Sequence, residues 1–341
     1  MSFQDVKKVC VDVRAVIRGL VAAVVITPLA TMAAPAAAQD ASNFPERAIR
    51  LIVPYPAGGV TDILARKIAQ QVSTKWGKQM YVDNVTGASG IVGTRTAANA
   101  APDGYTLLFT NTHIMSLNPN LFKDLPYDPL RDFVPVTLAA RVSNVLLVGP
   151  EFPAKNLQEL IALAKEKPGE FTFASNSPGS TNHLSGEMLK MQGNIDLLHV
   201  PYKSSTAAVI DLIAGRISMM FDNLTTATPY IKDGRLKALA VTSEKRVATL
   251  PDVPTMKELG YDTFVITPWW GIVAPAKTPK PIVDKLRDAI VEALNNPEVH
   301  AYFVSQETEV VGSTPEELGK IIEADLSIWA DVIKTANVKV E

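Results

Sequence analysis

Leu51-Ile-Val-Pro-Tyr-Pro-Ala-Gly-Gly-Val-Thr-Asp62 is the stretch that decides the fold. It begins as a short apolar strand, breaks at two prolines, turns through Gly58-Gly59 and enters a helix whose N-cap we expect at Thr61. A strand that feeds a glycine-rich turn at a helix N-terminus is typical of anion sites, because backbone N–H groups point into the turn. The alternative interpretation is that the glycines only shape a βα turn.

The chain has 341 residues, which is enough for about two domains with sizeable cores. Residues 1–38 have the layout of a secretory signal peptide, with a basic leader, an apolar run over 20–34 and small residues before a cleavage site near Ala38. A retained membrane anchor is the other interpretation, although the apolar run is short for a membrane span.

The only cysteine is Cys10, which lies before the apolar run, so the mature protein has no thiol or disulfide. An exported protein without cysteines fits a bacterial periplasm. The formal net charge is −2, and removing residues 1–38 takes away four basic and two acidic residues and makes it −4. A mildly acidic protein without a basic run excludes nucleic acid as a partner and disfavours anionic membranes.

Short apolar runs alternate with helical patterns along the chain, which predicts parallel βαβ units. One series covers the first part of the chain and a second begins after residue 150, with extended segments at 143–150 and 264–273 between them. We therefore expect an α/β fold of two lobes joined by a double crossover, with lobe 1 formed by residues 44–142 and 270–341 and lobe 2 by 143–269. We expect helices over 281–295 and 314–335, the second opened by a capping box, to pack on lobe 1.

Six stretches in fixed order resemble one family. They are Tyr55-Pro-Ala-Gly-Gly-Val-Thr-Asp62, Gly87-Ala-Ser-Gly90, Pro102-Asp-Gly-Tyr105, Asn176-Ser-Pro-Gly-Ser-Thr-Asn-His183, Pro201-Tyr-Lys203 and Pro251-Asp-Val-Pro254. Their order and spacing resemble the Bug proteins, the periplasmic substrate-binding proteins of tripartite tricarboxylate transporters. The resemblance covers residues 44–341 and implies a two-lobe periplasmic-binding-protein (Venus-flytrap) fold, an organic-acid ligand held by neutral donors and integral-membrane transporter subunits as partners.

The candidate ligand-binding residues lie at the ends of predicted strands. In the first turn they are Tyr55, Ala57, Gly58, Gly59 and Thr61, and Ala57 stands where the family commonly has proline. In lobe 2 they are Asn176, Ser177, Ser180 and Thr181, for which ordinary helix capping is the competing role. Further candidates are Thr86, Ser89, His113, Asp222 and Trp270. The alternative role of Asp222 is helix capping. His113 could instead bond a neighbouring carbonyl, and the alternative for Trp270 is core or hinge packing.

Residue patterns for enzymes are missing from the sequence. There is no dinucleotide or Walker motif, no G-x-S-x-G elbow and no histidine pair spaced for a metal. We therefore expect a monomeric binding protein with no catalytic residue, metal or cofactor. Its ligand would be a phthalate- or terephthalate-like aromatic dicarboxylate, a citrate-like acid or an aliphatic dicarboxylate. The alternatives are a periplasmic sensor partner that presents its ligand to a signalling receptor, and an enzyme on the same scaffold.

Overall fold

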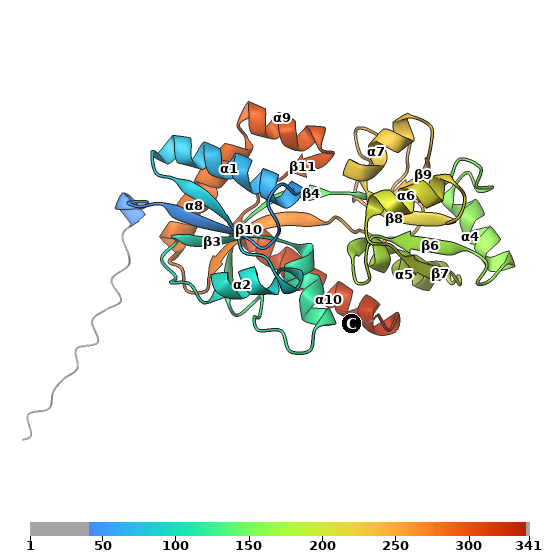
Figure 1. Cartoon of the computed structure of the whole chain (residues 1–341), viewed down its shortest axis with the longest axis horizontal. Helices are drawn as coiled ribbons and strands as arrows, with labels where there is room; N and C mark the ends of the chain where they lie inside the picture. The colour runs from blue at the N-terminus through green and yellow to red at the C-terminus, as the bar shows by residue number, and fades with distance from the viewer. Residues whose placement is uncertain (1–40, 339–341) are drawn as a thin grey trace, which may run out of the picture. The chain divides into compact units, whose positions relative to one another are not determined.

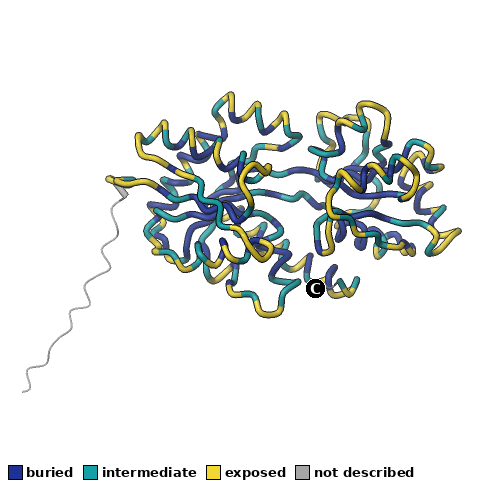
Figure 2. Tube along the Cα trace, in the orientation of Figure 1, coloured by how far each residue is buried: buried dark blue, intermediate teal, exposed yellow. Residues whose placement is uncertain are grey.

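A computed structural model describes residues 41–338, and the signal peptide expected over 1–38 lies outside the described residues. The described residues form one compact unit that contains two sheets. Figure 1 shows each sheet with helices on both of its faces, and Figure 2 shows buried stretches inside each lobe with exposed residues along the outer turns. In residues 41–338 no helix combines the length and the apolar character needed to cross a membrane.

The first sheet has six strands in the order β11-β4-β10-β3-β1-β2. Its strands are β1 (Ile49–Val53), β2 (Met80–Asn84), β3 (Thr106–Asn111), β4 (Phe133–Val142), β10 (Trp269–Pro275) and β11 (Thr308–Val310). β1 is parallel to β2 and β3, whereas β10 is antiparallel to β3 and β4. The sheet is thus mixed, and only its β1–β3 part has the parallel βαβ arrangement that the sequence predicted. The carboxyl ends of β1, β2 and β3 share one edge.

The helices of this lobe include two that the sequence did not predict, α3 and α9. The helical elements are η1 (Ala41–Asn43), α1 (Val60–Trp76), η2 (Ala88–Gly90), α2 (Ile91–Ala98), η3 (His113–Leu117), α3 (Asn118–Leu121), α8 (Lys280–Leu294), α9 (Pro297–Ser305) and α10 (Pro315–Thr335). Helices α1 and α8 share one apolar cluster with β1, so each covers the sheet through residues such as Leu64, Ile68 and Leu286. Burial of such side chains contributes about 1.5–3 kcal/mol each before the entropy of ordering them is subtracted.

The second sheet has five strands in the order β7-β6-β8-β5-β9. Its elements are β5 (Asn144–Val148), α4 (Leu157–Glu166), β6 (Thr172–Ser175), α5 (Thr181–Gly193), β7 (Leu198–Pro201), α6 (Ser205–Ile213), β8 (Met219–Asn223), α7 (Leu224–Lys232) and β9 (Lys237–Val241). β6 is parallel to β7 and β8, and β5 is antiparallel to β8 and β9.

The chain passes between the two sheets twice, as the predicted double crossover requires. It leaves the first sheet at the end of β4 and enters β5 two residues later, and it returns from β9 to β10 through residues 242–268. Figure 1 shows β4 and the segment before β10 as these two connections.

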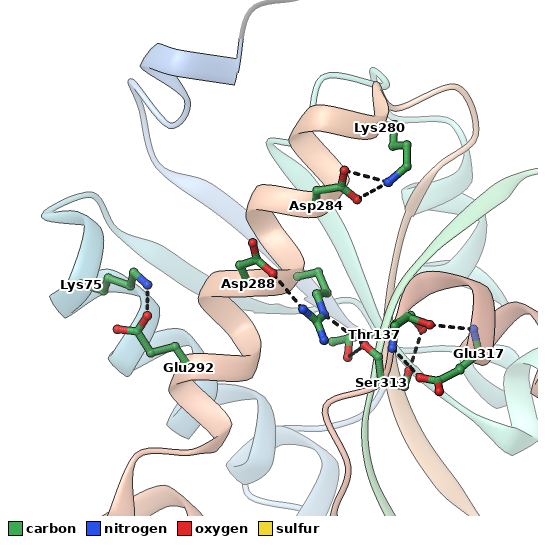
Figure 3. Close-up of polar contacts among 10 residues, drawn as sticks. Lys75, Thr137, Lys280, Asp284, Asp288, Glu292, Ser313 and Glu317 are labelled. Carbon is green, nitrogen blue, oxygen red and sulfur yellow. Dashed lines mark hydrogen bonds and ion pairs between the residues drawn. The ribbon is translucent and has the colours of Figure 1, made fainter.

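Helix α10 packs on lobe 1, as expected, and it packs on lobe 2 as well. Its capping box is present, with the Thr314 side chain accepting from the Glu317 N–H and Glu317 accepting from the Thr314 N–H (Figure 3). Its first turns pack in a lobe 1 cluster through Leu318 and Ile322. Its last turns, through Trp329 and neighbouring residues, pack in the main lobe 2 cluster. The helix is therefore shared by both cores, whereas α8 belongs to lobe 1 only.

Candidate functional site

The turn after β1 leaves the N-terminus of α1 without a side-chain cap. Gly59 is the N-cap residue and Val60 the first helical residue, so the predicted N-cap at Thr61 was wrong by two positions. No side chain in residues 41–338 caps this end, and residues 57–60 are exposed. N–H groups without a side-chain acceptor at the positive end of a 17-residue helix have the chemistry to bind an anion.

Asp62 shapes this turn from inside. Its Oδ2 accepts from the Gly58 N–H at 2.9 Å and from Arg66 Nε at 2.9 Å, and its Oδ1 accepts from Asn84 Nδ2 at 2.9 Å. Burial alone would raise the pKa of this carboxyl, but these hydrogen bonds and the Arg66 charge outweigh it and hold the pKa below its usual value. The Gly58 N–H is thus used internally, while the N–H groups that follow it remain for a ligand.

Two aromatic side chains flank the same turn. The Trp270 Nε1–H donates to Thr61 Oγ1 at 3.0 Å, and the Tyr55 hydroxyl is paired with the Asn111 side chain at 3.0 Å. Burial raises the pKa of Tyr55 to about 12, so this hydroxyl stays protonated as a neutral donor. The structure therefore brings Tyr55, Thr61 and Trp270 together, and Trp269 lies on the opposite side, where its Nε1–H donates to Asp325.

The turn after β2 has an unusual left-handed backbone. Gly87, Ala88, Ser89 and Gly90 all have positive φ values, which are 45° at Ala88 and 53° at Ser89. Non-glycine residues in this region cost about 1 kcal/mol or more each, and such strain is concentrated at functional sites. The Ser89 carbonyl accepts from Asn118 Nδ2 at 3.2 Å, which fixes the turn at the shared edge of the sheet. His113 begins the π-helical turn after β3, and burial lowers the pKa of its imidazole.

On lobe 2, the loop after β6 is organised by the cap of α5. Ser180 Oγ accepts from the His183 N–H at 3.3 Å and donates to the Ser177 carbonyl at 2.7 Å, so Ser180 has the capping role that competed with ligand binding. His183 Nδ1 accepts from the Gly179 N–H at 3.0 Å, which holds the loop from below. Thr181 Oγ has no hydrogen-bond partner in residues 41–338 and is partly accessible, so it remains available to a ligand.

Asp222 lies beneath this loop rather than on its surface. Its side chain is 0% exposed, and its Oδ1 accepts from Ser205 Oγ at 2.8 Å and Asn182 Nδ2 at 3.0 Å. Its Oδ2 has no partner within the described chain, and the same is true of Asn176 Oδ1. Burial raises the pKa of Asp222 to about 6. The Asp222 carboxyl therefore holds Asn182 and Ser205 in place and has no exposed surface of its own for a ligand.

Sequence reasoning missed Ser205 and treated the histidines as scattered. The His183 and His199 rings stack with their centroids 3.8 Å apart, and His199 Nε2 lies 2.8 Å from Ser175 Oγ. Burial is the main reason that the pKa of His183 falls to about 3 and that of His199 to about 4. Both rings are neutral near pH 7 and support the loop by packing. The pairing of β6 with β7, which aligns Phe173 with His199, could have suggested the stack.

The two rims offer neutral groups rather than cations. Arg66 is held by Asp62 and Asn84, and no group of three or more metal-ligating side chains occurs in residues 41–338. Within this part of the chain, no hydrogen bond joins the Tyr55–Thr61 turn to the Asn176–Thr181 loop. Each rim makes its hydrogen bonds without the other rim, as expected of two surfaces that close on a ligand.

Comparisons with known proteins agree with this arrangement. The family model described as the tripartite tricarboxylate transporter family receptor matches residues 64–338. Protein BugT of Bordetella pertussis is 37% identical over 307 residues, which cover 90% of this chain and 94% of BugT. The structure of R. palustris Rpa4515 with adipate is 33% identical, has a TM-score of 0.72 and covers 87% of this chain and 99% of that protein. The structure of MatC from Rhodopseudomonas palustris with bound malate is 31% identical, has a TM-score of 0.69 and covers 85% and 100%.

These relatives confirm the two-lobe fold and the resemblance to Bug proteins. Their family is one of solute-binding receptors and not of enzymes, and it places the protein in the periplasm. The chain belongs to the tripartite tricarboxylate transporter receptor family, the Bug-type periplasmic solute-binding proteins.

Proposed function

We propose that this receptor captures a small dicarboxylate between its lobes and delivers it to the integral-membrane subunits of a tripartite transporter. The observation that carries the proposal is the uncapped N-terminus of α1, whose N–H groups have no side-chain acceptor within residues 41–338 and are exposed beside Thr61. A carboxylate satisfies these donors and the helix dipole together. The absence of a free cation at either described rim is consistent with neutral donors doing this work.

The second carboxylate would meet the other rim. Thr181 Oγ is accessible on lobe 2, and we propose Thr86–Ser89, which overlaps the left-handed turn at Gly87–Gly90, as a further contact on lobe 1. Adipate and malate, which two relatives carry, are both aliphatic dicarboxylates. Tyr55 and Trp270 beside Thr61 add flat apolar surface, which supports phthalate- and terephthalate-like acids as members of the same ligand class.

A thermal-shift screen of the purified protein tests the proposal. The panel contains adipate, malate, citrate, phthalate and terephthalate, together with the corresponding diamides as neutral controls. A ligand that binds only the folded state contributes about 2.7 kcal/mol at 100 times its Kd, which raises the Tm by several degrees. No shift with any acid, or equal shifts with acids and diamides, contradicts the proposal.

A matched pair of variants separates binding from capping. Thr181→Val removes a hydroxyl that has no partner in the described structure, so it should leave the Tm of the free protein unchanged and reduce the ligand-induced shift. Ser180→Ala removes the α5 cap and should lower the Tm of the free protein by the equivalent of about 1 kcal/mol. Its ligand-induced shift should be retained. The reverse pattern would place the contact on Ser180 instead.

Uptake measurements test the transporter partnership. Deleting the gene should abolish uptake of the bound acid if the protein serves a transporter. If uptake persists and only ligand-dependent gene induction is lost, the protein serves a signalling receptor instead.

A further inference from the structure

The strand orders place the two candidate rims on one side of the strands that connect the lobes. In the first sheet, β3, β1 and β2, whose exit turns form the lobe 1 rim, lie on one side of β4 and β10, and β11 lies on the other. In the second sheet, β8, β6 and β7 lie on one side of β5, and β9 lies on the other. β11 and β9 are therefore the edges of the two sheets that face away from the rims.

A groove of about 560 Å³ joins these two far edges. It is lined from lobe 1 by residues 307–309, which form the corner before β11 and the start of that strand, and from lobe 2 by residues 243–249, which follow β9. Because both edges line the same groove, β11 and β9 lie on the same side of the molecule. A rotation about the connecting strands that brings the rims together therefore widens this groove.

Helix α7 of lobe 2 contacts lobe 1 at this groove, which its first residue Leu224 also lines. Thr225, in the first turn of α7, donates its hydroxyl hydrogen to the Gln306 carbonyl at 2.6 Å. Gln306 is the C-cap of α9, where carbonyl groups lack partners within the helix, so Thr225 satisfies an acceptor of the other lobe. At the other end of α7, Lys232 Nζ lies 3.9 Å from Glu307 Oε1. We call these two interactions the far-side contact.

The hydroxyl bond is the stronger half of the far-side contact. It is short and Thr225 is half-buried, so water competes with it poorly. The ion pair is long and Lys232 is 62% exposed, and pairs of this kind contribute little. The Thr308 hydroxyl also donates to the Gln306 carbonyl, at 3.1 Å, so this acceptor keeps a partner when Thr225 moves away. The contact is thus weak enough to be released during a change of shape.

We propose that the far-side contact opposes closure of the receptor and thereby sets its affinity for the ligand, with Thr225 as the residue that carries the effect. This proposal rests on the proposed function, in which the lobes close on a dicarboxylate. Closure moves Thr225 away from Gln306 and costs their hydrogen bond. A hydrogen bond of ordinary net strength changes an equilibrium about two- to tenfold. While the closed form is the minor form of the free protein, the apparent affinity changes by the same factor.

Single-molecule FRET on the ligand-free protein tests the proposal without any ligand. The labels are placed at Tyr81→Cys in β2 and Leu198→Cys in β7, two exposed residues on the rim-side edge strands of the two sheets. Cys10, the only cysteine of the chain, is replaced by serine so that only the introduced thiols react. We expect Thr225→Val to raise the ratio of closed to open molecules about two- to tenfold. A ratio that does not rise overturns the proposal.

Two further variants separate the hydrogen bond from other effects of the substitution. Thr226→Val is the matched control, because Thr226 is the next residue of α7, is also half-buried and has no hydrogen-bond partner in residues 41–338. It should leave the ratio unchanged. Thr225→Ser keeps the hydroxyl and should keep the ratio of the natural protein. A rise in either variant as large as that in Thr225→Val refutes the assignment to this hydrogen bond.

Calorimetry with adipate and malate as probes extends the test to affinity. Thr225→Val should bind the acid about two- to tenfold more tightly than the natural protein and Thr226→Val. Equal affinities, or weaker binding by Thr225→Val, overturn the claim that the far-side contact sets affinity. If neither acid binds any of these proteins, the proposed function fails for both acids, whereas the closed-to-open ratio still decides whether the contact opposes closure.

Discussion

Replacing Asp222 with asparagine should make the protein more stable at neutral pH. The carboxyl is fully buried, its Oδ1 accepts hydrogen bonds from Ser205, Asn182 and the Asn223 N–H, and its Oδ2 has no partner within residues 41–338. Burial raises its pKa from 3.8 to about 6, because the charged form loses its hydration without gaining a cation. Asparagine keeps one acceptor oxygen for the three donors and carries no charge.

The shift of about two pH units corresponds to about 3 kcal/mol, since one unit is worth 1.36 kcal/mol. The sign follows from proton linkage: a carboxyl with a raised pKa stabilises the fold most below its ordinary pKa, and that stability is lost as the pH rises through about 6. The variant and the natural protein should therefore have similar free energies of unfolding near pH 4. By pH 7.5 the variant should be the more stable one, by up to about 3 kcal/mol.

Urea unfolding of both proteins at intervals from pH 4 to pH 8 measures this difference. The stacked histidines, whose lowered pKa values act in the opposite direction, are present in both proteins and cancel in the comparison. Asp325→Asn is a matched control, since burial also raises the pKa of that carboxyl to about 6. A difference that stays constant across the pH range, or a less stable Asp222→Asn protein at pH 7.5, would refute the reasoning.

Three further changes probe the first-lobe rim. Asp62→Asn leaves one oxygen for three donors and should cost about 2–3 kcal/mol of unfolding free energy above pH 4, measured by urea unfolding. The variant should also bind the acid more weakly because the Gly58 turn loosens. An unchanged urea midpoint of unfolding contradicts this prediction. Trp270→Phe removes the hydrogen bond to Thr61 and should lower the affinity for the acid several-fold in calorimetry, while the Tm changes by a few degrees at most. Unaltered affinity argues against Trp270 and Thr61 as part of the ligand site. Gly93→Ala places a methyl group 2.5 Å from a backbone carbonyl and should lower the free energy of unfolding by about 3 kcal/mol or more. An unchanged Tm would contradict the close packing of α2 at this position.

Local patterns predicted the first-lobe rim well because its parts lie close together in the sequence. Proline, glycine and apolar spacing marked the strand, the turn and the helix over 51–76, and the structure has all three. The position of the cap was missed because Thr61 is a strong N-cap residue, yet its hydroxyl accepts from Trp270, which is 209 residues away. A tertiary hydrogen bond of that kind leaves no local signal.

The division of α10 between two cores illustrates the same limit. Its apolar stripe predicts that one face is buried, but a stripe does not state which partner buries it. Leu318 and Trp329 fit the same helical pattern and belong to clusters of different lobes. Likewise, alternation along a strand places the neighbours Trp269 and Trp270 on opposite sides, but only the fold shows that one side is α10 and the other is the α1 turn.

The two rims differ in a way that bears on specificity. At α1 no side chain of residues 41–338 accepts from the first-turn N–H groups, so these groups are free to bind an external anion in place of water. At α5 the Ser180 hydroxyl already accepts from His183 and is held by Ser177, so that helix needs no ligand to complete its cap. A carboxylate is therefore expected at the first rim, since it accepts from these donors and also interacts favourably with the helix dipole. The second rim, with an accessible Thr181 hydroxyl above a buried polar cluster, tolerates groups that differ in length and polarity. An acid that lost its first-rim carboxylate should lose binding altogether, whereas changes at its other end should alter affinity by degrees.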